Sequence, residues 1–236
     1  MRKSILITGA SSGIGRATAE LFLAQGWNVG LLARREAPLR EIAGSQKNAV
    51  VLPADISDPE AVDQAVSEFV KQTGQLDVLF NNAGIFVPSA PIDETPMEDW
   101  QRALDVNLTG MFLAARAAFA QMRAQGGGRI INNGSISAHV PRENAISYTV
   151  TKHAITGLTK QLDLDGRELN IPCGQIDIGN AESEMVAALK LKVPDMPTMA
   201  VADVAKSVFH MANLPLETNV LFMTVMANKM PYIGRG

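Results

Sequence analysis

Short apolar runs alternate with longer helical patterns along the whole chain, and this alternation limits the folds open to it. Seven runs rich in Ile, Val and Leu are candidate strands: Ser4–Thr8, Asn28–Ala33, Ala49–Pro53, Leu76–Asn81, Arg129–Asn133, Pro172–Asp177 and Asn219–Val225. Six helical patterns lie between them: Gly13–Gln25, Glu36–Ala43, Pro59–Thr73, Pro96–Ala124, Ala145–Glu168 and Val201–Ala212. Runs that are apolar throughout predict strands buried on both faces, as in a parallel sheet. The strict β–α order, with right-handed crossovers, predicts an α/β fold with a doubly wound sheet.

The length and charge indicate one globular domain. A chain of 236 residues can fold as a single α/β domain, so we expect residues 1–236 to form one unit, with 180–198 as a substrate-loop insertion. A net charge of −3 offers no attraction for nucleic acid or an anionic membrane. The apolar runs are too short for a spanning helix, which needs ~20 residues, or for a signal peptide. We therefore expect a cytoplasmic protein that binds neither partner.

The sequence offers little to a metal ion or a disulfide. Cys173 is the only cysteine, so it has no partner within the chain. His139, His153 and His210 lack the paired spacing of metal ligands. We expect no metal site and no catalytic histidine.

The first candidate strand runs directly into a glycine-rich turn, Thr8-Gly9-Ala10-Ser11-Ser12-Gly13-Ile14-Gly15, and a helical pattern follows. Glycines at such a turn let the backbone approach a pyrophosphate, whose charge then meets the helix N-terminus. The spacing is G-x-x-x-G-x-G, not the more common G-x-G-x-x-G. A simple strand-to-helix turn would use the same residue types.

A second pattern concerns proton transfer. Tyr148 and Lys152 are four residues apart, so on a helix they project from the same face. A tyrosine side chain, with an ordinary pKa near ~10, becomes a better acid–base group beside an ammonium, which favours the phenolate. Ser135 could hold a substrate oxygen while Tyr148 gives or takes its proton. These residue types suit carbonyl–alcohol interconversion with hydride from a nicotinamide, although a tyrosine–lysine pair alone also suits a solvated helix face.

Several motifs in the same order resemble those of the short-chain dehydrogenase/reductase family. They are the T-G-x-x-x-G-x-G turn, Asn81-Asn82-Ala83-Gly84 after the fourth strand, and Y-x-x-x-K at Tyr148 and Lys152, with Ser135 thirteen positions before the tyrosine. The resemblance covers essentially the whole chain. It implies a single Rossmann-type domain with about seven strands, helices on both faces, and oxidoreductase activity on CH–OH and C=O groups.

The resemblance also implies roles for individual residues. Asn107, Ser135, Tyr148 and Lys152 would be catalytic, with Asn107 helping to hold a proton-relay water and Lys152 also binding the nicotinamide ribose. The cofactor-binding residues would be Gly9, Ser11, Ser12, Gly13, Ile14, Gly15, Arg34, Arg35, Asp55, Ile56, Asn82, Ala83, Gly84, Tyr148, Lys152, Gly179 and Ser183. It further implies a homodimer or homotetramer acting on a small carbonyl or alcohol substrate.

Cofactor choice depends on the end of the second strand. An acidic residue there would bind the adenosine 2′-hydroxyl and repel a 2′-phosphate. This chain has Ala33 at that position, followed by Arg34 and Arg35. We therefore expect NADP to be preferred, with NAD also possible.

The chain departs from the family pattern after the sixth strand, where Ile178-Gly179 replaces the usual P-G pair and Ser183 replaces a threonine. The loss of the proline removes a backbone constraint.

Two other functions share much of the pattern. A cofactor-binding sensor would not need Ser135, Tyr148 and Lys152 together, and an epimerase or dehydratase of the extended relatives usually has a larger C-terminal domain.

Overall fold

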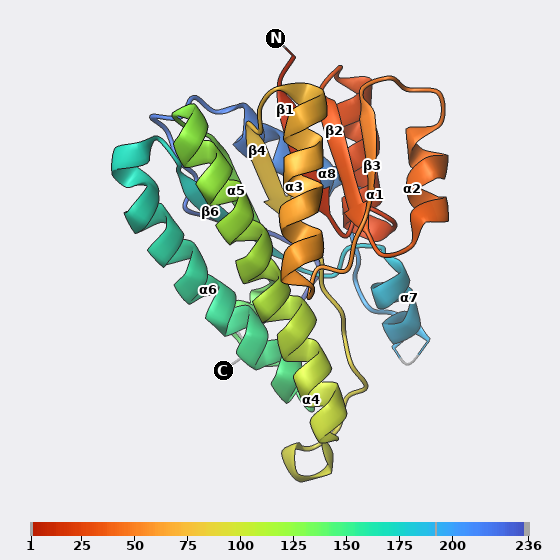
Figure 1. The fold of residues 1–236 in the computed structure, drawn as a ribbon. Helices are drawn as coiled ribbons and strands as arrows, with labels where there is room; N and C mark the ends of the chain where they lie inside the picture. Colours follow the sequence, from red (N-terminus) through yellow and green to blue (C-terminus); the bar gives the residue numbers. More distant parts are fainter. Residues whose placement is uncertain (1, 192, 234–236) are drawn as a thin grey trace.

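Seven strands form one parallel sheet in the computed structural model, which describes residues 2–191 and 193–233 (Figure 1). The strands are β1 (Ser4–Thr8), β2 (Asn28–Ala33), β3 (Ala49–Pro53), β4 (Val78–Asn81), β5 (Arg129–Asn133), β6 (Cys173–Ile178) and β7 (Phe222–Val225). Their order across the sheet is β3-β2-β1-β4-β5-β6-β7, and every neighbouring pair is parallel. This confirms the predicted Rossmann-type doubly wound sheet.

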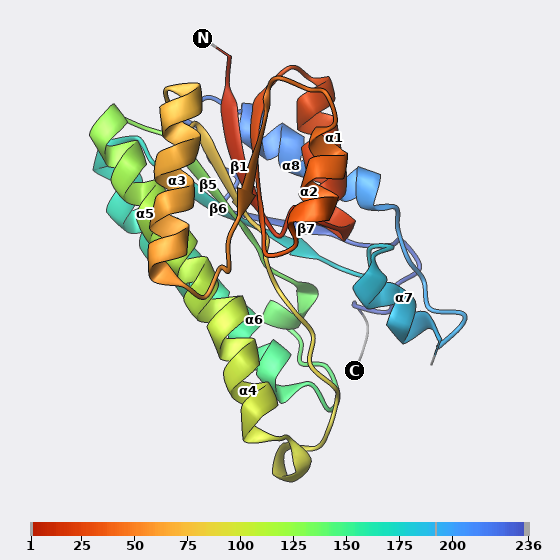
Figure 2. The same ribbon diagram turned by 45° about the vertical axis from the view of Figure 1, so that its right-hand side comes forward.

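Helices cover both faces of the sheet. They are α1 (Gly13–Ala24), α2 (Glu36–Ala43), α3 (Pro59–Thr73), α4 (Met97–Leu104), α5 (Met111–Gln125), α6 (Ile146–Gly166), α7 (Glu184–Lys190) and α8 (Val201–Asn213). Figure 2 shows α1, α2 and α8 on one side of the strands and α3 and α5 on the other. In both views α4, α7 and the start of α6 lie past the carboxyl ends of the strands.

Two apolar cores follow from this layering. Ile5 and Ile7 of β1 pack into the core beneath α1, α2 and α8, whereas Leu6 packs into the core beneath α3 and α5. Side chains alternate between the faces of a strand, so a strand apolar at every position serves both cores. All three side chains are fully buried, as the continuous apolar runs predicted.

The boundaries of β4 differ slightly from the sequence prediction, which began that strand at Leu76. The amide and carbonyl of Leu76 instead bond to the side chain of Gln125, at 3.1 and 2.7 Å. The adjacent Asp77 accepts the backbone N–H of Ser4 through its carboxylate, at 2.7 Å. Side-chain partners therefore replace the backbone bonds of Leu76 and those between Asp77 and β1, whereas the Asp77 carbonyl still accepts the N–H of Arg129 on β5 at 2.8 Å.

The helix expected over Pro96–Ala124 contains an unpredicted change of winding. A π-helical turn, Asp105–Gly110, lies between α4 and α5. Gly110 approaches Ile56 so closely that a Cβ there would lie 2.9 Å from a side-chain carbon of Ile56. Turns of this kind are rare and often lie at functional sites.

The predicted insertion, residues 180–198, includes the short helix α7. The hydroxyl of Ser183 accepts the N–H of Val186 at 3.3 Å and so caps this short helix. Backbone bonds from Met199 to Asn180 and from Glu182 to Met199, at 2.9 and 2.8 Å, tie the two ends of the segment together. Within the described ranges, none of the helices is both long and apolar enough to cross a membrane.

Candidate active site

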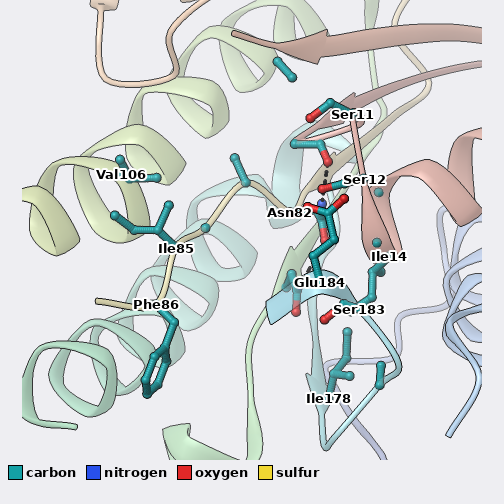
Figure 3. A pocket seen from close by; sticks show the side chains of 18 of the residues that line it. Ser11, Ser12, Ile14, Asn82, Ile85, Phe86, Val106, Ile178, Ser183 and Glu184 are labelled. Atoms are coloured by element: carbon teal, nitrogen blue, oxygen red, sulfur yellow. Dashed lines mark hydrogen bonds between the residues drawn. The ribbon is translucent and has the colours of Figure 1, made fainter. Parts of the chain in front are cut away.

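A cavity of about 710 Å³ opens at the carboxyl ends of the strands. The neighbouring strands β1 and β4 mark the point where the chain reverses its direction of travel across the sheet, and such switch points bind ligands in open α/β folds. Every cofactor-binding residue named from the sequence lines this cavity, as do Ser135, Tyr148 and Lys152; Asn107 does not. Figure 3 shows Ile85, Phe86 and Val106 on one side, facing Ser11, Ser12 and Ile14.

The glycine-rich turn needs its glycines for steric reasons. Gly9 and Gly13 have φ values of +67° and +53°, which strain other L-residues. A Cβ on Gly15 would lie 2.2 Å from the carbonyl oxygen of Gly9. Side chains at these positions would therefore push α1 away from β1 and fill the space beside the turn.

The start of α1 offers unused hydrogen-bond donors. Ser12 precedes the helix with an extended backbone, and within the described chain its side chain makes no capping bond. The first α1 turn also lacks an acidic residue, and the first N–H groups of a helix have no intrahelical acceptor. A phosphate would satisfy these donors and the positive end of the helix dipole. The turn therefore fits the pyrophosphate of a dinucleotide.

A chain of polar contacts fixes the edge of the sheet below the cavity. The backbone N–H of Asn82 donates to the hydroxyl of Thr8 at 2.8 Å, and Asn133 donates to the Asn82 side chain at 2.7 Å. Lys152 then donates from Nζ to the carbonyl oxygen of Asn133 at 2.8 Å. These contacts join β1, β4, β5 and α6 across the switch point.

Lys152 and Tyr148 lie together on α6, as their spacing predicted. The ammonium of Lys152 is 5.6 Å from the centre of the Tyr148 ring, and the lysine is buried. Phe86 packs on the tyrosine ring, with ring centres 5.1 Å apart. The phenol ring is thus held between an aromatic wall and a buried cation.

Ser135 rests against a buried carboxylate that the sequence analysis did not select. Its backbone N–H donates to Asp177 at 3.1 Å, and Gln175 donates to the same carboxylate at 2.7 Å. The other carboxylate oxygen is 2.8 Å from Nε2 of His139. Asp177 is fully buried, and its contacts with Ser135 and His139 hold the serine segment against β6.

Asn107 anchors the segment that follows β4. Its side-chain oxygen accepts the N–H of Ile85 at 2.7 Å, and its amide donates to the Ile85 carbonyl at 2.9 Å. The side chain is buried, and both bonds hold the segment after β4.

The opposite end of the cavity carries Arg34, Arg35 and Asp55. Arg34 lies 4.0 Å from Asp55, and its side chain is 68% exposed. Burial raises the pKa of Asp55, but hydrogen bonds from Ser57 and the charge of Arg34 outweigh burial and hold it below the ordinary value. Asp55 is therefore ionised at neutral pH, and its carboxylate is stabilised in part by the positive charge of Arg34.

Gly179 shows why a glycine remains after β6 although the family proline is absent. A Cβ there would lie 2.7 Å from Cβ of Met226 and 2.9 Å from the sulfur of Met230. The backbone N–H of Gly179 also donates to Val225 at 2.9 Å. The segment after β7 thus packs directly on this turn. Its packing restricts the turn, which lacks the backbone constraint of the family proline.

Three residues that the sequence analysis missed shape the site: Asp177, Phe86 and Arg142. Phe86 and Arg142 line the cavity. Asp177 had a visible signal, because a carboxylate inside an apolar strand needs buried partners. Arg142 had none, since the partner of its guanidinium, Asn180, lies 38 positions away in the sequence.

Known proteins resemble this chain over nearly its full length. The family model described as short chain dehydrogenase matches residues 3–193. A trans-4-hydroxycyclohexanecarboxylate dehydrogenase from Sinomonas cyclohexanicum is 34% identical over 205 residues, covering 83% of this chain and 78% of that protein.

Solved structures share the fold as well. A 3-ketoacyl-(acyl-carrier-protein) reductase from Brucella melitensis, complexed with NADH, superposes with a TM-score of 0.89 at 26% identity, covering 96% of this chain and 97% of the other. ElxO with NADP bound gives a TM-score of 0.88 at 26% identity, covering 96% and 98%. The family match, the relative and the shared architecture together show that this chain is an oxidoreductase of the short-chain dehydrogenase family.

Proposed function

We propose that the protein is an NADP(H)-dependent oxidoreductase that interconverts a carbonyl and an alcohol, with Tyr148 as the acid–base group. One observation carries the proposal: a buried ammonium, Lys152, lies 5.6 Å from the Tyr148 ring in the cavity that also contains Ser135 and the glycine-rich turn. A sensor would need the turn alone. The joint placement of all three side chains favours turnover.

Each side chain has a distinct task in this mechanism. The Tyr148 hydroxyl gives its proton to the substrate oxygen during reduction and takes it back during oxidation. Ser135 donates a hydrogen bond that orients the same oxygen, and Lys152 stabilises the phenolate left behind. A bound nicotinamide would supply or accept the hydride. Lys152 would also hold the ribose hydroxyls, since the Asn133 carbonyl is its one acceptor among the described residues, which leaves ammonium donors for a ligand.

The preference for NADP rests on the end of β2. Ala33 leaves no carboxylate there to repel a 2′-phosphate, and the exposed Arg34 and Arg35 line the adjoining cavity wall. A phosphate at this position would compete with Asp55 for the guanidinium of Arg34. Among similar structures, ElxO is bound to NADP and the Brucella reductase to NADH, so both dinucleotides fit this architecture.

The activity itself is tested by NADPH oxidation with a panel of cyclic and linear ketones. We expect reduction of at least one ketone, with NADPH used more efficiently than NADH. Tight NADPH binding without turnover of any carbonyl or alcohol would favour the sensor.

Arg34→Ala is expected to weaken NADPH binding about ten- to a hundredfold while NADH binding changes little, because a charge-assisted hydrogen bond contributes about 1.5–3 kcal/mol. Exposure and the nearby Asp55 place the effect toward the lower end. Calorimetric titration of both cofactors measures it. Arg40→Ala is the matched control, since Arg40 is equally exposed but pairs with Glu36 on α2.

A substitution at the neighbouring position should change the cofactor preference in the opposite way, by favouring NADH. Ala33→Asp should shift the preference toward NADH, because a carboxylate there binds the 2′-hydroxyl and repels the phosphate. Equal weakening of both cofactors by Arg34→Ala would mean that Arg34 does not recognise the phosphate, and the NADP assignment would be withdrawn.

We also propose a homodimer or homotetramer. Large apolar side chains are exposed on two helices of one face: Phe112 on α5 and Leu164 on α6 are 48% and 55% exposed. A second copy covering these helices would remove that surface from water. A single-chain mass in light scattering would contradict the proposal.

A further inference from the structure

A cation without a carboxylate partner lies at the substrate end of the cavity. Arg142 lines the cavity wall and is half-buried. Its guanidinium donates to the side-chain oxygen of Asn180 at 3.3 Å. Among the residues that the structure describes, no acidic side chain comes within ion-pairing distance of it.

The guanidinium is held from the side of β6. Asn180 is 5% exposed, and its amide donates to the carbonyl of Pro197 at 3.3 Å. The carbonyl of Asn180 accepts the N–H of Met199 at 2.9 Å. Because the amide nitrogen is turned toward Pro197, the side-chain oxygen faces Arg142. A buried neutral group thus orients the cation without neutralising it.

The backbone of Arg142 is fixed beside Tyr148. Its N–H lies 3.4 Å from the hydroxyl of Thr149, the residue after the tyrosine. Asn144, with φ of +54°, accepts the N–H of Ala90 at 3.0 Å and joins this loop to the segment after β4. Arg142 is therefore placed at the acid–base end of the cavity, whereas Arg34 and Arg35 lie at the end of β2.

Other charged groups that line the cavity already have partners. Asp55 is engaged by Ser57 and Arg34, and Lys152 by the Asn133 carbonyl beside Tyr148. Glu184 is exposed on α7. Arginine stays protonated and presents five donors in a planar fork that matches a carboxylate. The partly desolvated Arg142 thus favours an anionic ligand group.

We propose that Arg142 binds a carboxylate on the substrate, so the substrates are keto acids and hydroxy acids. The apolar side chains of Ile85, Phe86 and Ile178 line the same cavity (Figure 3), and they suit the hydrocarbon part of such a molecule. The substrate class rests on the proposed carbonyl–alcohol activity. Binding of a carboxylate by Arg142 does not, and it can be measured separately.

The test compares acids with their methyl esters at three spacings: pyruvate, acetoacetate and 4-oxopentanoate. We expect the wild type to favour at least one acid over its ester in kcat/KM. Arg142→Ala should lower that acid-to-ester ratio about ten- to a hundredfold, the equivalent of one charge-assisted hydrogen bond, and Arg142→Lys should restore part of it. Arg167→Ala, an exposed arginine on the turn after α6, should leave the ratio unchanged.

Other outcomes would overturn the assignment. A wild type that favours every ester, or an Arg142→Ala variant with an unchanged ratio, would show that Arg142 does not bind the carboxylate. A large rise in the NADPH dissociation constant of Arg142→Ala would instead place the guanidinium on a cofactor phosphate. If no ketone is reduced, the proposed activity fails, and calorimetry of the NADPH-loaded protein with each of the three acids still decides the inference. Binding of an acid that is lost in Arg142→Ala would support it, and the failure of all three acids to bind the wild type would reject it.

Discussion

Tyr148→Phe is expected to lower the turnover number by at least ~10²-fold, the lower range for a positioned acid–base group. NADPH binding should remain close to that of the wild type, because the substitution removes one hydroxyl and keeps the ring. The ring packs on Phe86 at 5.1 Å and on the Lys152 ammonium at 5.6 Å, and phenylalanine preserves both contacts. The structural consequences should therefore be small and the chemical consequence large.

The chain contains a matched control for this experiment. Tyr232, the only other tyrosine, lies in the segment after β7 and does not line the cavity. Tyr232→Phe therefore removes an equivalent phenol hydroxyl away from the site. Steady-state rates with saturating ketone and fluorescence titration with NADPH separate turnover from binding. Near-normal turnover in Tyr148→Phe would mean that another group transfers the proton.

Local patterns were enough to predict much of this architecture. The strand set followed from runs such as Ile5–Ile7, whose alternate side chains enter opposite cores, and parallel pairing followed from the absence of a polar face. Tyr148 and Lys152 meet because a helix brings residues four apart onto one face. The glycine-rich turn was equally local, since Gly9 and Gly15 constrain each other across six positions.

The features that escaped prediction depend on contacts between distant segments. The π-helical turn accompanies Asn107 bonding to the backbone of Ile85, 22 positions away. Arg142 meets Asn180 only because two loops converge beyond the sheet. Gly179 is constrained by Met226 and Met230, so the reason for that glycine lies in the segment after β7. Periodicity and spacing carry no information on such pairings.

Asp177 illustrates a signal that was present but needed the fold to interpret. Gly134 can have no side chain there, because a Cβ would lie 2.1 Å from the Asp177 carboxylate. The carboxylate in turn accepts the N–H of Ser135 at 3.1 Å. The segment that carries Ser135 is therefore positioned from β6 by a buried acceptor.

Lys152→Ala is expected to reduce both turnover and NADPH binding more than Tyr148→Phe does. Turnover should fall by ~10³-fold or more, beyond the effect of one acid–base group, and NADPH should bind more weakly. Lys152 is only 4% exposed, and its ammonium donates to the Asn133 carbonyl at 2.8 Å and lies above the Tyr148 ring. Its removal leaves that carbonyl without its donor.

Two comparisons separate these contributions of Lys152. Lys160→Ala, at an exposed position two turns along α6, controls for the loss of a lysine from the same helix. Thermal unfolding of Lys152→Ala controls for damage to the polar edge that Asn82 and Asn133 form. If the variant stays folded and binds NADPH as tightly as the wild type, Lys152 does not hold the ribose. If its turnover falls no further than that of Tyr148→Phe, the ammonium acts on the phenol alone, since a second contact to the cofactor would add its own loss.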